Sequence, residues 1–211
     1  MKKISAVVGI LFIASCAPMK ITSTWTNTTA VGRTYENIVV VALTKFESEG
    51  NLRERMEEHI VGDLSRLGLK AVSSYKLMGP TSFKGMNEIQ VLRLFETAGI
   101  DGVLTVVLLD KKREQYYIPA RVMYSPYAVY QNNFWGYYGT MYNRIYEPGY
   151  YSVDTRYFWE SNLYDLKSKT LQYSIQTQAF DPLSLEALSH NYGKKIVESM
   201  VKDGVIKLLK N

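Results

Sequence analysis

The sequence predicts an α+β or α/β fold, a mixed sheet of about five or six strands with three helices packed mainly on one face. Apolar runs at 38–43 and 103–109 are typical of strands buried in a sheet. Three apolar stripes have helical spacing, and residues 171–178 alternate as in a strand with one buried face. The chain has 211 residues, 46% hydrophobic and 21% charged, which suits one domain with a packed core.

A strand, a helix and a second strand are predicted between residues 38 and 73. Residues 38–43 are mostly β-branched, as in a strand buried on both faces. Asn51 and Glu54 have the spacing of a capping box at a helix start, and Gly68 lies where helices end. The helix carries one apolar stripe of Leu52, Met56, Ile60, Leu64 and Leu67. Residues 69–73 form the predicted second strand.

A second helix and strand follow the first unit. Asn87 and Gln90 indicate another capped helix start, and 103–109 is the next buried strand. The predicted buried face of this helix comprises Val91, Leu94, Phe95 and Ala98.

A hairpin and a final helix complete the predicted domain. The hairpin joins strands at 157–165 and 171–178, the second with Leu171, Tyr173, Ile175 and Thr177 on one face. Asp181 or Ser184 is the expected cap of the final helix. Its buried stripe comprises Leu185, Leu188, Tyr192, Ile196 and Met200.

The amino terminus has the pattern of a signal peptide. Lys2 and Lys3 precede an apolar stretch at 4–13, which as a helix covers only about 15 Å, half of a bilayer core. The residues Ile13-Ala14-Ser15-Cys16 then resemble a bacterial lipobox. This resemblance implies cleavage between Ser15 and Cys16, a diacylglyceryl group on the Cys16 sulfur and an N-acyl chain such as palmitate. The alternatives are an ordinary secretory signal with an incidental cysteine, or a buried cysteine in a cytosolic protein.

These patterns divide the chain into three parts. Residues 1–15 are the lipoprotein signal peptide, 16–36 a lipid tether with a short edge strand at 19–26, and 37–211 a single α/β domain. Ala17 and Pro18 carry no acidic sorting signal, so we expect an outer-membrane lipid anchor with the domain facing the periplasm.

A tyrosine-rich insertion is predicted at about residues 115–156. Eleven of the 17 tyrosines lie between Tyr116 and Tyr151. Three interpretations stay open: a loop packed on its own domain, an exposed surface for a protein, glycan or membrane partner, and a hairpin that joins an oligomer. The candidate interaction surface comprises Tyr127, Tyr130, Phe134, Trp135, Tyr137, Tyr138 and Tyr142.

Catalytic patterns are not found, so we expect no enzyme activity and no cofactor or metal. His59 and His190 are interpreted as helical residues that lie at or near the surface, and Glu57 and Glu58 as neighbours that face solvent. No glycine-rich phosphate loop follows a strand. The basic run 111–113 is interpreted as a solvated turn, and no nucleic-acid partner is expected.

The order of strands and helices between residues 19 and 206 resembles an uncharacterised family of bacterial envelope lipoproteins. Its hairpin residues are 162–165 and 171–174. The layout is also distantly similar to the periplasmic α/β domains of the curli-secretion lipoprotein and of TolB. The resemblance implies a periplasmic binding or scaffold module. The alternatives are a subunit of an oligomeric outer-membrane export or assembly complex and an envelope glycan hydrolase; the oligomeric state stays open.

Overall fold

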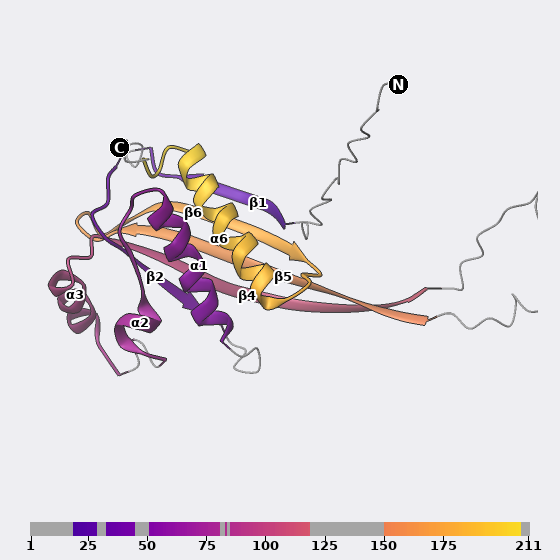
Figure 1. Cartoon of the computed structure of the whole chain (residues 1–211). Coiled ribbons are helices and arrows are strands. Elements are labelled where there is room, and N and C mark those ends of the chain that lie inside the picture. Colours follow the sequence, from indigo (N-terminus) through magenta and orange to yellow (C-terminus); the bar gives the residue numbers. More distant parts are fainter. Residues whose placement is uncertain are drawn as a thin grey trace, which may run out of the picture.

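The structure is a computed structural model that describes residues 19–28, 33–44, 51–80, 83, 85–118 and 150–207. It confirms the predicted α+β class with a mixed sheet of six strands in the order β1-β6-β5-β4-β2-β3 (Figure 1). The strands are β1 (Met19–Thr26), β2 (Ile38–Leu43), β3 (Ala71–Ser73), β4 (Gly102–Ile118), β5 (Tyr150–Asp165) and β6 (Thr170–Phe180). The helices are α1 (Leu52–Arg66), α2 (Ser74–Met78), α3 (Glu88–Thr97) and α6 (Leu185–Lys202).

The sheet has a parallel part and an antiparallel part that share β4. Strand β2 pairs in parallel with β3 and β4, and each connection between these strands contains helices. Strands β4, β5, β6 and β1 form antiparallel neighbours, and β1 lies at the sheet edge where a short strand was predicted.

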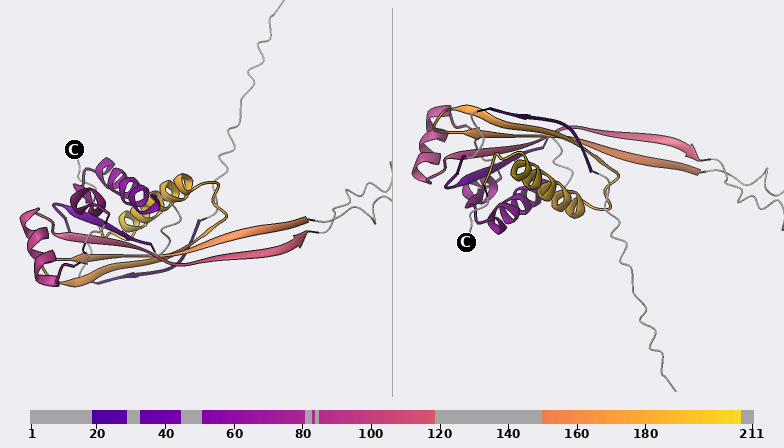
Figure 2. Two further views of the ribbon diagram at one scale, coloured as in Figure 1. Left: turned by 90° about the horizontal axis from the view of Figure 1, so that it is seen from below. Right: turned by 90° about the horizontal axis from the view of Figure 1, so that it is seen from above.

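Helices α1 and α6 lie together on one face of the sheet (Figure 2). They bury Leu104 of β4, Trp159 of β5 and Tyr173 of β6, each with 0% exposure. Helix α3 packs Phe95 against Val39 on the opposite face. Two of the three long helices therefore cover one face, as predicted, and β2 is buried on both faces because α3 covers the other side.

Local cap signals mark the starts of α1, α3 and α6, but the side-chain cap forms only at α3 and α6. Asn87 and Gln90 form the capping box of α3, and Ser184, not Asp181, caps α6 by accepting from the Ala187 amide. The expected capping box of α1 is absent, because the Asn51 side chain accepts from Arg55 instead of from the helix backbone. The Arg55 guanidinium therefore binds the Asn51 side-chain oxygen that a capping box would use.

Strand β6 contains a bulge that alternation alone did not reveal. Leu163 pairs with Tyr173 and Tyr164 pairs with Leu171, so Gln172 is an extra residue in β6. Leu171 therefore lies on the face opposite to Tyr173, and its predicted place beside Tyr173 is wrong.

Candidate functional site

The residues predicted to carry lipid or contact a partner lie outside the described residues. The lipidation and cleavage sites and the proposed aromatic surface therefore stay predictions. They are Ser15 and Cys16, together with Tyr127, Tyr130, Phe134, Trp135, Tyr137, Tyr138 and Tyr142.

The described strands on either side of residues 119–149 project beyond the sheet. The last β2–β4 pair is Leu43 with Val107, and the last β5–β6 pair is Arg156 with Phe180. Beyond these pairs, residues 113–118 and 150–155 have no other strand partner among the described residues; at the base, the Thr155 carbonyl also accepts from the Asp181 amide at 2.7 Å. We call these two segments the arm, and Figure 1 shows it projecting beyond the other strands. At about 3.3 Å per residue, its six paired rows span about 20 Å.

The arm exposes aromatic side chains on a frame of paired charges. Tyr116, Tyr150 and Tyr151 are 44%, 62% and 67% exposed, and the Tyr116 hydroxyl donates to Asp154 at 3.2 Å. Ion pairs from Lys112 and Arg156, at 2.5 and 3.2 Å, reach the Glu114 carboxylate from the base of the arm. The hydrogen bond from Lys112 and the charge of Arg156 lower the pKa of Glu114.

The base of the arm holds two cations against aromatic rings. The Lys111 ammonium lies 5.1 Å from the centroid of the Tyr157 ring, and the Arg156 guanidinium lies 5.5 Å from that of Phe180. Partial burial, with the charge of Arg113, lowers the pKa of Lys111. These contacts fix the arm at the point where it leaves the body.

The interpretation of residues 111–113 as a solvated turn is wrong. These residues continue β4, and Lys111 and Arg113 pair with Tyr157 and Thr155 of β5. No described helix covers this part of β4 (Figure 2), so its side chains need not alternate between apolar and polar. The sequence therefore carries no strand pattern at these residues. The two ends of the predicted insertion, 115–118 and 150–156, are likewise strand.

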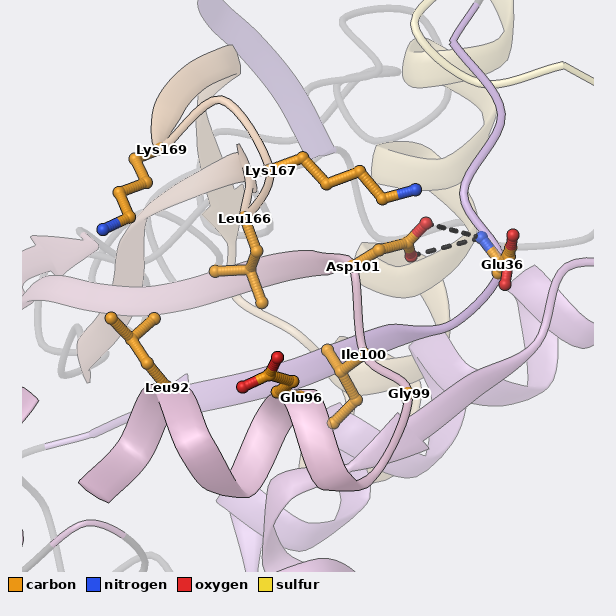
Figure 3. A pocket seen from close by; sticks show the side chains of 9 residues that line it. All are labelled: Glu36, Leu92, Glu96, Gly99, Ile100, Asp101, Leu166, Lys167 and Lys169. Carbon is orange, nitrogen blue, oxygen red and sulfur yellow. Dashed lines mark hydrogen bonds between the residues drawn. The ribbon is translucent and has the colours of Figure 1, made fainter. Parts of the chain in front are cut away.

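A cavity of about 530 Å³ lies at the other end of the sheet (Figure 3). Leu92 and Glu96 of α3 face Lys167 and Lys169 of the β5–β6 turn across it. Asp101 lines it too, but the carboxylate of Asp101 accepts from the backbone amides of residues 36 and 37 at 2.9–3.1 Å. The cavity therefore offers charges of both signs together with apolar side chains from both of its sides, and Asp101 is occupied in holding the chain that enters β2.

A salt bridge stabilises the turn beside this cavity. Asp165 forms an ion pair with Arg33 and accepts from the Ser168 amide at 2.6 Å. Burial acts to raise the pKa of Asp165, but the hydrogen bonds from Ser168 and Arg33 outweigh it and lower that pKa.

Glu57 is completely buried, so its predicted place facing solvent is wrong. Its carboxylate accepts from the backbone amides of Ala42 and Tyr75 at 2.9 and 2.7 Å. The hydroxyls of Ser73 and Ser74 donate to it at 2.6 and 2.8 Å, and Arg53 forms an ion pair with it at 3.3 Å. With both oxygens fully used, Glu57 joins β2, β3, α1 and α2 and has no oxygen left for substrate.

The two histidines of the chain meet between α1 and α6. The His59 and His190 rings are 5.5 Å apart, and Nε2 of His59 lies 2.7 Å from a Glu186 oxygen. Arg55 pairs with the same carboxylate, and the hydrogen bonds from His59 and Arg55 lower the pKa of Glu186. Within the described ranges, no three His, Cys, Asp or Glu side chains form a group that could hold a metal ion. No helix in the described part of the chain is both long and apolar enough to cross a membrane.

Comparison with known proteins assigns the chain to no family. No protein-family model matches it, and no curated protein matches its sequence. Among solved structures, it is similar to a PelC dodecamer from Paraburkholderia phytofirmans, with a TM-score of 0.46 and 10% identity, over 85% of this chain and 95% of that chain. It is also similar to lipoprotein GNA1162 from Neisseria meningitidis, with a TM-score of 0.41 and 13% identity, over 79% and 98% of the two chains. The likeness concerns the layout of strands and helices.

Proposed function

We propose that this chain is a lipid-anchored cell-envelope protein whose domain faces the periplasm and acts by binding through the arm. The observation that carries the binding role is the arm itself, which extends two strands beyond the sheet and exposes Tyr116, Tyr150 and Tyr151. Tyrosine suits wet interfaces because it combines an apolar ring with a polar hydroxyl.

Anchoring is supported by the amino-terminal sequence. Acylation of Cys16 with two or three chains would hold the protein stably, since each buried methylene contributes about 0.8 kcal/mol. The substitution Cys16→Ser is expected to release the protein from membranes or to leave its signal peptide attached, as measured by fractionation and mass spectrometry. Unchanged fractionation and processing would contradict lipid anchoring.

Binding is favoured over catalysis by the way in which three carboxylates of the body, two buried and one half-buried, are used. Glu57, Asp101 and Asp165 each hold backbone amides. A glycan hydrolase needs two available carboxylates about 5–9.5 Å apart in one cleft.

A second candidate is a subunit of an oligomeric outer-membrane assembly. The observation in its favour is that both edges of the arm lack a strand partner among the described residues. Open strand edges accept a strand from another chain.

Photo-crosslinking tests the binding role of the arm. A photoreactive residue at Tyr116, which is 44% exposed, is compared with one at Tyr164 in the body, which is 36% exposed. In intact envelopes, adducts are expected at position 116 and not at 164. Equal adduct formation at both positions would contradict the proposal. Adducts between two copies of the chain would favour the assembly subunit.

An arm-less variant gives an independent measurement. Lys112 pairs with Arg156, so an Asn-Gly turn can join these two residues and replace 113–155. We expect the variant to fold, because the core lies outside the deleted segment, and to lose the adducts formed from a photoreactive residue at Lys112. A folded variant that keeps those adducts would contradict a role for the arm.

A further inference from the structure

The arm leaves the domain at the end of the sheet where β1 begins. Met19, the first residue of β1, pairs with Ala179 of β6. Ala179 also pairs with Tyr157, which pairs in turn with Lys111 of β4. These four residues form one row across four strands, and the arm begins two residues beyond this row (Figure 1).

The stretch between Cys16 and the first residue of β1 is shorter than the arm. Cys16 precedes Met19 by three residues, which span at most about 10 Å even when fully extended. Along β4, Ile118 lies seven residues beyond Lys111, roughly 23 Å further from the shared row. A lipid on Cys16 would therefore hold this end of the sheet so close to the bilayer that an arm directed toward the membrane reaches the lipid surface.

The side chains of the arm suit the headgroup layer of a bilayer. Tyrosine is enriched at membrane interfaces, where its ring and hydroxyl meet apolar and wet surroundings. Arg113 adds a positive charge near Lys111 and Tyr157 at the base of the arm, while Glu114 is neutralised by Lys112 and Arg156. The open backbone edges need water or headgroups as hydrogen-bond partners, which excludes the hydrocarbon core as their surroundings.

We infer that the arm is a second membrane contact, with Tyr116, Tyr150 and Tyr151 at the headgroup level of the bilayer that holds the Cys16 lipid. The inference rests on the proposed anchoring and names the lipid surface as the partner of the arm. The cavity between α3 and the β5–β6 turn then lies at the end away from the membrane.

Environment-sensitive labels test this orientation. Lipid attachment would occupy the chain's one cysteine, so an introduced cysteine is a unique labelling site. The acylated protein carries the label at Y150C or V153C in the arm, or at K167C in the far turn as a matched exposed control. It is reconstituted in vesicles of phosphatidylethanolamine and phosphatidylglycerol that contain a headgroup quencher.

The expected result is quenched, blue-shifted emission at both arm positions and water-like emission at position 167. Vesicle flotation distinguishes failure of the membrane contact from failure of the lipid anchor. Protein that floats with vesicles but emits alike from arm and turn overturns the membrane contact and leaves the anchor intact. Protein that does not float overturns the anchor and the contact together.

Discussion

Strands β4 and β5 pass through two surroundings, the body of the domain and the arm, and they are held differently in each. In the body, Leu104, Val106 and Leu108 of β4 are at most 3% exposed beneath α1 and α6. In the arm, Tyr116 of the same strand is 44% exposed. The ladder is continuous from one region to the other except for a bulge between Leu108 and Asp110.

The difference shows that the body holds the arm. An isolated two-stranded ribbon is marginally stable in water because it has no core. Here the core of the body fixes the paired rows of β4 and β5 that lie under the helices, and backbone hydrogen bonds between the two strands continue from there into the arm. Such a segment is suited to presenting side chains at a distance, since Tyr116, Tyr150 and Tyr151 have no place in the core.

The largest effect is expected from the buried carboxylate of the body. Glu57→Ala leaves two amides, two hydroxyls and Arg53 without their shared acceptor, and should lower the free energy of unfolding by about 3–5 kcal/mol. The neighbouring Glu58→Ala, which loses only an exposed pair with Lys76, should change it by less than about 0.5 kcal/mol. Urea unfolding measures both, and similar losses would contradict the structural role of Glu57.

The next effect compares body and arm within one strand. Leu104→Ala opens a cavity in a fully buried site and should cost about 2–5 kcal/mol. Tyr116→Ala should cost less than about 0.5 kcal/mol, because its ring is not packed in the core. A loss at Tyr116 as large as that at Leu104 in urea unfolding would show that the arm is part of the folding core.

The smallest effect concerns acid. The folded pKa of Asp165 is lowered, so its contribution to stability is present above the ordinary carboxyl pKa of about 3.9 and is lost as pH falls through the folded value. Asp165→Asn should therefore destabilise the protein at neutral pH and flatten its loss of stability in acid. Glu114→Gln in the arm should do so much less, because water screens its exposed ion pairs. Urea unfolding at a series of acid pH values measures the free energy of unfolding of both variants. An equal change in the pH dependence of the two variants would contradict the difference between body and arm.

The partners of Glu57 explain why its burial was missed. On the sequence it is one of two adjacent glutamates in an amphipathic helix. The last β2–β3 pair is Val40 with Ser73, so the Ala42 amide has no partner in β3 and donates to Glu57 instead. The Ala42 amide requires this acceptor because β3 is short, and β3 lies in a different part of the chain.

The pattern of residues was enough to place the buried parts of the strands, the long helices and the cap at Asn87, and to limit the cap of α6 to Asp181 or Ser184, because these features depend on neighbours within a few positions. Only the folded chain decided that α3 covers the second face, that Glu57 is buried and that two strands leave the sheet as an arm. These features depend on where neighbouring strands end, and contacts between residues distant in sequence settle that.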